Sequence, residues 1–294
     1  MVNLDDLEAR TRSHAHVSEK PAPAAAKKRS MSDTTTKGPA ARPELPEIDV
    51  REHASFRGRD QVSDRRLFMQ LLVFRAPVGG DAAKPAEALH GALAGEQIPG
   101  VVYADANDPR GIALLTWSED PALFVDRVRP LFARHELNTL ELRPEFTMIG
   151  RSYATGFEPD LEYWLLRRYP ENVTAEGWPW AVWYPLRRSG AFAQLTAEEQ
   201  RGILGEHALI GRAYGAQDLA HDVRLACHGL DPNDNEFVIG LIGKDLHPLS
   251  HVVQSMRSTK QTSEYITQMG PFFVGKVLHV SRGKVEAESA AHGG

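Results

Sequence analysis

The sequence is short of several features that would assign it to a class at once. Its 294 residues include one cysteine, Cys227, which excludes an internal disulfide and a cysteine-rich zinc or iron–sulfur site within the chain. No run of about 18–20 apolar residues, the length that spans a bilayer, occurs, and the first residues lack the pattern of a secretion signal. The net charge of −5 is small and argues against a broad surface for nucleic acid or anionic membrane. We therefore expect a cytoplasmic protein that binds neither nucleic acid nor a membrane.

Both ends of the sequence differ in composition from its middle. Residues 1–62 are rich in Pro, Ala, Lys, Ser and Thr and poor in large apolar residues. Such a segment buries too little apolar surface to offset the entropy that it loses on ordering. The sequence therefore predicts a disordered N-terminal tail over 1–62 and a frayed C-terminal tail over 283–294.

The remaining residues show the same order of elements twice. Strand-like and helix-like patterns follow one another as β-α-β-β-α-β in both halves. We place one module at 63–160 and the other at 181–282, joined by an aromatic segment at 161–180 that we expect to pack as a helix and turn. Two such units are ferredoxin-like modules, so the expected fold class is α+β, with the two sheets packed face to face.

The pattern also sets individual elements within these modules. It predicts one unbroken closing strand over 140–150 in the first module. In the second module it predicts a long helix over 196–214, a strand over 222–230 and a helix over 249–266.

The helix predicted over 196–214 carries the first candidate for chemistry. On a helix, His207 shares one face with the residues four before it and three and seven after it, Ile203, Ile210 and Tyr214. That face is otherwise apolar apart from the tyrosine hydroxyl. A histidine there must be hydrogen-bonded within the core or must bind a ligand, and helical spacing alone favours the core histidine.

Cationic and aromatic residues flank this helix in the sequence. The strand before it ends in WYPLRR (183–188), and RRYP (167–170) lies upstream. Arginine binds carboxylates through two parallel hydrogen bonds. Arginines around an aromatic, apolar cavity therefore suit a flat apolar ligand with carboxylate arms, although each arginine could equally lie on a solvated surface.

From residue 167 to 275 the sequence resembles the chlorite dismutase superfamily, and it is most similar to the coproheme decarboxylases, which are peroxide-dependent haem synthases. The matching segments are, in order, RRYP (167–170), YPLRR (184–188), EEQRGILGEHALIGRAY (198–214), GLD (229–231), EFVIGL (236–241), MR (256–257) and GPFFVGKVL (270–278). The resemblance implies a dimeric α+β barrel, built from two ferredoxin-like modules in one chain and assembled into a homo-oligomeric ring, commonly a pentamer. It also implies one iron porphyrin, haem b or coprohaem, in the C-terminal module.

The resemblance further implies roles for single residues. His207 matches the ligand of the iron. Tyr184 matches the tyrosine that forms a radical next to a propionate arm. The expected contacts of the porphyrin and its propionates are Arg167, Arg187, Arg188, Phe192 and Ser263.

One departure from the superfamily concerns the partner of the iron-binding histidine. Gln261 stands where a glutamate usually accepts a hydrogen bond from that histidine. A neutral amide would make the imidazole less anionic and the iron easier to reduce. A shift of three residues in register would place Glu264 there instead.

A second departure concerns the opposite, distal side of the porphyrin. Counting forward from His207 places the distal position at Ala220, and counting back from the GLD turn places it at Asp222. Arg224, the nearest arginine of the kind that chlorite dismutases need, matches neither count. His221 lies between the two counts, and we predict it as a distal acid–base residue.

The function that the resemblance implies is the oxidative decarboxylation of coprohaem propionates to haem b. In that scheme the iron reacts with hydrogen peroxide, and Tyr184 takes a hydrogen atom from a propionate. One alternative is a chlorite dismutase-like or weakly peroxidatic haem protein. Another is a family member that binds haem for transfer or sensing, or that has lost haem binding.

Overall fold

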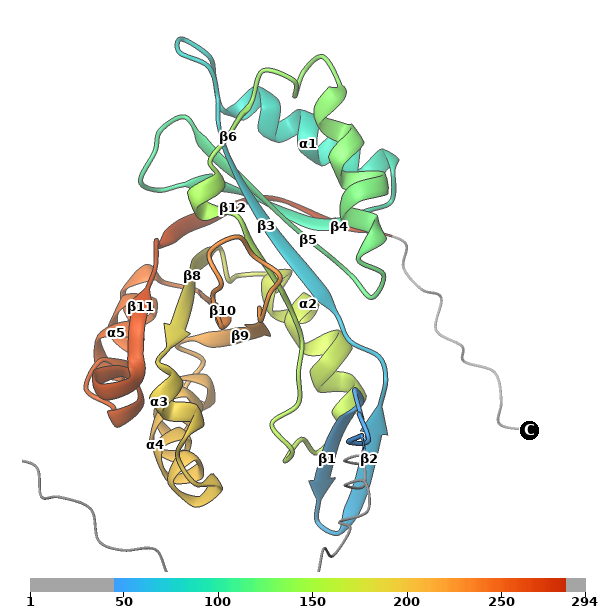
Figure 1. Cartoon of the computed structure of the whole chain (residues 1–294). Helices are drawn as coiled ribbons and strands as arrows, with labels where there is room; N and C mark the ends of the chain where they lie inside the picture. The colour runs from blue at the N-terminus through green and yellow to red at the C-terminus, as the bar shows by residue number, and fades with distance from the viewer. Residues whose placement is uncertain (1–44, 284–294) are drawn as a thin grey trace, which may run out of the picture. The chain divides into compact units, whose positions relative to one another are not determined.

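The computed structural model describes residues 45–283, in which Asp49 begins the unit that carries both modules. The N-terminal module contains β3 (Phe68–Arg75), α1 (Ala83–Gly95), β4 (Pro99–Asp105), β5 (Gly111–Ser118), the short helices η1 (Phe124–Val128) and η2 (Arg129–Ala133), β6 (Glu141–Leu142), the helical turn η3 (Pro144–Phe146) and β7 (Met148–Arg151). The helical segments η4 (Tyr163–Arg167) and α2 (Arg168–Val173) follow. The C-terminal module contains β8 (Trp180–Arg188), α3 (Gly190–Ala193), α4 (Ala197–Ala216), β9 (His221–Ala226), β10 (Phe237–Gly243), α5 (Leu246–Met256), η5 (Gln261–Tyr265), β11 (Ile266–Met269) and β12 (Phe273–Arg282) (Figure 1).

The main strands of the two modules close into one barrel. Within the modules the strands pair in the orders β7-β3-β5-β4 and β12-β8-β10-β9. The module edges then pair with each other, β4 with β12 along most of their length and β7 with β9 at Arg151 and Ala226. The α+β class and the two ferredoxin-like modules are therefore confirmed. The sequence predicts that the two sheets pack face to face. In the structure their edge strands also pair with each other.

The barrel interior is filled by apolar side chains from both modules. Leu71 and Tyr103 come from the first module, and Trp183 and Phe273 come from the second. Gly240 on β10 makes room for the indole of Trp183, since a Cβ at this position would lie 2.6 Å from that ring. Burial of these large side chains supplies the main apolar free energy of the fold.

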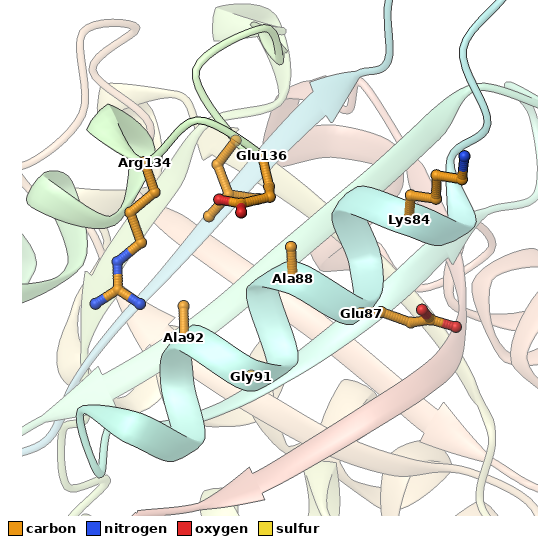
Figure 2. Close-up of a pocket in the computed structure, with 8 residues that line it drawn as sticks. Lys84, Glu87, Ala88, Gly91, Ala92, Arg134 and Glu136 are labelled. Atoms are coloured by element: carbon orange, nitrogen blue, oxygen red, sulfur yellow. The ribbon is translucent and has the colours of Figure 1, made fainter.

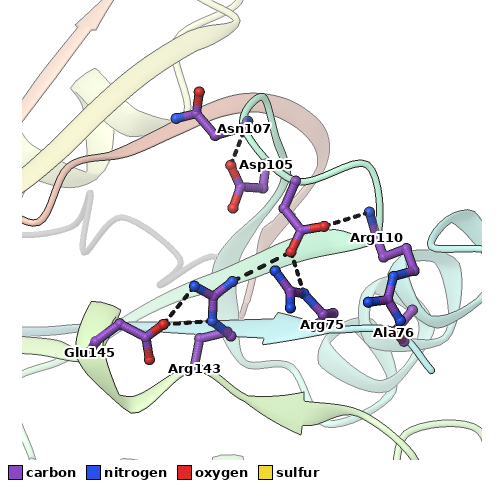
Figure 3. A network of polar contacts seen from close by, with 8 residues as sticks. Arg75, Ala76, Asp105, Asn107, Arg110, Arg143 and Glu145 are labelled. Atoms are coloured by element: carbon purple, nitrogen blue, oxygen red, sulfur yellow. Dashed lines mark hydrogen bonds and ion pairs between the residues drawn. The ribbon is translucent and has the colours of Figure 1, made fainter. Parts of the chain in front are cut away.

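The closing strand of the N-terminal module is interrupted, whereas the sequence predicts one strand over 140–150. Pro144 begins η3 and separates β6 from β7, because proline has no N–H to give to a strand ladder. Ionic contacts hold this segment to the end of β3. The Asp108 carboxylate accepts hydrogen bonds from Arg75 Nε at 2.5 Å and from Arg143 Nη1 at 3.4 Å (Figure 3).

Two further predicted boundaries are wrong in the C-terminal module. The strand predicted over 222–230 ends at Ala226, where a turn begins. The helix predicted over 249–266 runs only from Leu246 to Met256, and the short helix η5 and strand β11 follow it. Strand β11 pairs with β8, so its residues gain ladder hydrogen bonds that a longer helix would forgo.

The hairpin formed by β1 (Glu52–Phe56) and β2 (Arg59–Ser63) corrects the prediction of disorder up to residue 62. Glu52 Oε1 accepts a hydrogen bond from Arg151 Nη1 at 3.1 Å. Ala54 is buried against Leu161 and Leu165 of the segment between the modules. These partners lie about a hundred positions further along the chain, so local composition could not reveal them. The rest of the predicted tails, 1–44 and 284–294, lies outside the described residues.

Candidate functional site

The outer face of the C-terminal sheet forms one wall of the candidate site. Side chains alternate along β8, so Ala181 and Trp183 enter the barrel while Val182 and Tyr184 face outward, toward helices α4 and α5. Strand pairing extends this outer face sideways. Tyr184 pairs with Ile239 on β10, and Ile239 in turn pairs with Arg224 on β9. A tyrosine, an isoleucine and an arginine therefore form one cross-strand row on this face.

Helix α4 forms the opposite wall (Figure 1). It begins with a capping box, in which the Thr196 hydroxyl accepts a hydrogen bond from the Glu199 N–H and the Glu199 carboxylate accepts one from the Thr196 N–H. The face that carries His207 is only half-buried, and Ile203 is the one fully buried residue of the helix. This helix face therefore keeps apolar surface that a ligand could cover.

The surroundings of His207 favour a neutral imidazole with one free nitrogen. Burial and the nearby charge of Arg224 hold the pKa of His207 below its ordinary value of 6.5. Its Nδ1 lies 3.4 Å from the hydroxyl of Thr259, and that hydroxyl donates to the Met256 carbonyl at 2.8 Å. The hydroxyl is therefore an acceptor for Nδ1–H, which leaves the Nε2 lone pair available to a metal. The sequence interpretation missed Thr259.

Neither residue predicted as the hydrogen-bond partner of His207 occupies that position. Gln261 is buried two residues beyond Thr259, and its Oε1 has no hydrogen-bond partner among the described residues. Glu264 is exposed to solvent. The threonine takes the contact because the chain turns into η5 directly after it.

Tyr184 is 6% exposed and stacks on Phe272, with the ring centroids 4.6 Å apart. Burial raises the pKa of Tyr184 well above its ordinary range, and the negative charge of Asp222 adds to the effect. The phenol therefore keeps its proton at neutral pH.

Charged residues lie beside this row on the same face. Asp222 Oδ2 lies 2.8 Å from Arg224 Nε, and Asp222 Oδ1 contacts Arg168 Nη2. Although burial opposes it, the charges of Arg224 and Arg168 hold the pKa of Asp222 below its ordinary value. The other terminal nitrogen of Arg168, Nη1, is buried with no hydrogen-bond partner in residues 45–283. Arg167, which the sequence predicts as the contact, is exposed instead, so the prediction misplaces the inward arginine by one residue.

His221 does not join the group, which corrects the prediction of a distal acid–base residue. It shares its side of β9 with Val223, which faces the barrel interior, and not with Asp222 and Arg224. Its ring stacks on Trp178 at 3.8 Å, and its Nε2 lies 2.8 Å from Asp218 Oδ1. Strand alternation, applied to the buried residues Val223 and Leu225, could have found Arg224 instead.

A cavity of about 430 Å³ opens at the end of β8, and its lining includes Arg187, Arg188, Phe192, Gln200, His228 and Glu236. Three predicted contacts therefore lie together here. The Arg188 guanidinium lies over the Phe192 ring at 4.2 Å and donates from Nε to Glu236 at 3.0 Å. Arg187 donates to the Asp234 carbonyl at 2.9 Å. Ser263 is not part of this lining; its hydroxyl donates to the carbonyl of Thr259, which precedes η5.

A second cavity, of about 510 Å³, lies on the N-terminal module against α1 (Figure 2). Its lining mixes charged ends, such as Lys84 and Glu87, with the small residues Ala88 and Gly91. None of the predicted site residues lines it. Within residues 45–283, no three or more His, Cys, Asp or Glu side chains are grouped so as to hold a metal ion. No helix in the described part of the chain has the length and apolarity to cross a membrane.

Comparison with known proteins agrees with this arrangement. The family model for chlorite dismutase matches residues 142–278, from the end of the N-terminal module through most of β12. A protein from Thermus thermophilus that is described as haem-binding superposes with a TM-score of 0.58 at 18% identity, covering 73% of this chain and 92% of that one. A mutant chlorite dismutase from Candidatus Nitrospira defluvii, in complex with cyanide, gives a TM-score of 0.57 at 13% identity, covering 74% and 92%.

At such identities the solved structures show a common fold, and the family model adds the match in sequence. Residues 142–278 match the chlorite dismutase family model, and the resemblance to that superfamily seen in the motifs is confirmed.

Proposed function

We propose that the C-terminal module binds an iron porphyrin, haem b or coprohaem, between α4 and the outer face of the sheet, with His207 Nε2 as the ligand of the iron. The observation that carries this proposal is that two surfaces face each other, on which His207, Ile239 and Arg224 are half-buried and Tyr184 is buried. One is the α4 face with a neutral His207, and the other is the row of Tyr184, Ile239 and Arg224. The haem-binding relative from Thermus thermophilus supports the same ligand class.

The residues present fit such a group. A metal ligand must be deprotonated at the binding nitrogen, and burial keeps His207 neutral. The propionates require cationic partners, and Arg168 offers a buried terminal nitrogen with no partner in the described residues. Arg187 and Arg188 lie at the neighbouring cavity, where Phe192 supplies an apolar wall. Bound iron would supply the reaction with hydrogen peroxide that no side chain here can provide.

We further propose oxidative decarboxylation of coprohaem as the activity. Tyr184 is the residue that would exchange a hydrogen atom at its phenol oxygen, and its raised pKa keeps that oxygen protonated. Phe272 fixes the ring by stacking, and the apolar cluster around Tyr184 excludes water. The arginines hold carboxylate arms and thereby limit which arm can approach Tyr184. The same proposal includes the homo-oligomeric ring, a pentamer, which light scattering of the full chain tests.

The test is a titration of the full chain with ferric coprohaem, followed by stepwise hydrogen peroxide, with the products analysed by mass. Wild type should release carbon dioxide from the porphyrin and form haem b. Tyr184→Phe should bind coprohaem but not convert it, whereas Tyr163→Phe, at a partly exposed tyrosine, should convert it normally. Binding without conversion in wild type would refute the decarboxylase and leave a transfer or sensing role.

A second candidate function, chlorite dismutation, is favoured by one observation. Arg224 shares the sheet face of Tyr184, and its charge lowers the pKa of His207. The two counts along the sequence had placed the distal position at Ala220 and at Asp222 instead. An arginine in this place could hold an anionic substrate close to an iron bound by His207. Oxygen release from chlorite by the haem-loaded chain, lost in Arg224→Gln, would support this function, and its absence in wild type would exclude it.

A further inference from the structure

Helix α4 keeps glycines that its packing does not require. Gly202, Gly205, Gly211 and Gly215 lie within its twenty residues. A Cβ added at Gly202 or Gly205 would meet no atom within 4 Å, and at Gly211 or Gly215 it would meet only ordinary contacts. Each glycine in a helix interior disfavours the helix relative to alanine. The sequence thus weakens this helix at positions where alanine would fit.

Gly202 and Gly205 lie on the side of the helix away from His207. At about 100° per residue, positions two and five before His207 lie roughly 140–160° around the axis from it. A group held by His207 therefore cannot touch them. Any effect of these two glycines on such a group must act through the stability of the helix.

Packing does little to offset this weakness. Ile203 is the only buried residue of α4, and Leu209 is 63% exposed. Single side-chain contacts tie the helix to α5 and the residues after it. Glu206 Oε2 accepts from the Lys260 N–H at 3.0 Å, and the Tyr214 hydroxyl lies 2.5 Å from His251 Nδ1. A helix with so little buried surface is stabilised mainly when another group covers its apolar face.

We infer that Gly202 and Gly205 hold α4 close to its folding threshold, so that porphyrin capture by His207 and the ordering of α4 are one coupled event. The identity of the ligand rests on the proposed function above. Because α4 must become ordered on binding, the coupling lowers the affinity of the protein for the porphyrin. Local unfolding of α4 would also let this large, flat ligand enter and leave. The glycines thereby set the balance between tight binding and release.

Hydrogen exchange of the ligand-free full chain tests the loosened helix directly. Gly202→Ala and Gly205→Ala should each raise the protection of the α4 amides roughly four- to five-fold, the factor that corresponds to a helix-propensity difference of about 0.8–1.0 kcal/mol. The double variant should raise it about twenty-fold. The amides of α1 should not change.

The matched control is Gly91→Ala in α1, where a Cβ also meets nothing within 4 Å (Figure 2). It should raise protection in α1 alone and leave ligand binding unchanged. Ferric coprohaem should protect the α4 amides of wild type. The double variant should bind it more tightly, by up to about the same twenty-fold, and release it more slowly.

Three outcomes would overturn this inference. In the first, the wild-type α4 amides are already as protected as those of α5. In the second, the alanine variants leave their exchange unchanged. In the third, the variants alter the mass of the oligomer instead, which would mean that Gly202 and Gly205 serve a contact with another chain. Failure of coprohaem to bind any variant would refute the proposed function, while the exchange of the ligand-free variants would still report on the helix.

Discussion

Replacing Gln261 by methionine should stabilise the ligand-free protein. The Gln261 amide oxygen is buried and has no hydrogen-bond partner in the described part of the chain. An unpaired buried polar atom costs about 1–3 kcal/mol. Methionine has a similar length, fills the same space and carries no strong hydrogen-bonding group. We expect Gln261→Met to raise the free energy of unfolding by about 1–2 kcal/mol, which for a domain of this size is about 2–4 °C in Tm per kcal/mol.

Urea unfolding followed by tryptophan fluorescence measures this change, provided that the slope of the transition is unchanged. The control is Gln254→Met on α5, an exposed position where the change should stay within about 0.5 kcal/mol. A loss of stability in Gln261→Met would refute the reasoning, because it would mean that the amide oxygen has a partner in solution. A gain would identify Gln261 as a residue retained at a cost in stability, as is common at functional sites.

Three further predictions concern the same fold and site. Asp108→Ala should lower the free energy of unfolding by about 1–2 kcal/mol in urea, since it leaves Arg75 without its carboxylate while Arg143 keeps Glu145, and an unchanged midpoint would exclude that role. Because burial and Arg224 hold the pKa of His207 below 6.5, the folded state binds fewer protons than the unfolded state, so stability should fall as pH falls below about 6.5. The loss should be smaller in His207→Gln, and an equal loss would contradict the pKa shift. Gly240→Ala should destabilise the barrel by about 1–3 kcal/mol in thermal unfolding, because its Cβ would collide with the Trp183 ring, and a wild-type Tm would show that the ring can move.

The sequence could predict the modules because their signals are local. The helix expected over 196–214 runs from Ala197 to Ala216, since the capping motif at Thr196 sets its start. The hairpin of β1 and β2 could not be predicted, because its stability comes from contacts with Arg151 and Leu161, far along the chain. The break at Pro144 could have been predicted, because proline cannot continue a strand ladder.

The site was predictable in part for the same physical reasons. His207 was selected from its helix face and Tyr184 from the family resemblance; the structure puts them on facing elements, and their roles stay predictions. Thr259 could not be predicted, since its contact depends on how α5 ends. His221 was chosen by counting residues between motifs, whereas the alternation of buried residues along β9 selects Arg224. Where two residue counts disagree, the face of the strand is the better guide.

The central claim, that His207 ligates the iron of a porphyrin, is tested most directly by chemical rescue. Ferric haem is titrated into wild type and into His207→Ala, with and without free imidazole, and the Soret band is recorded. We predict saturable binding in wild type, loss of the histidine-ligated spectrum in His207→Ala, and its return with imidazole. The control His135→Ala, at an exposed histidine, should match wild type. A wild-type spectrum and affinity in His207→Ala, with no response to imidazole, would contradict the claim.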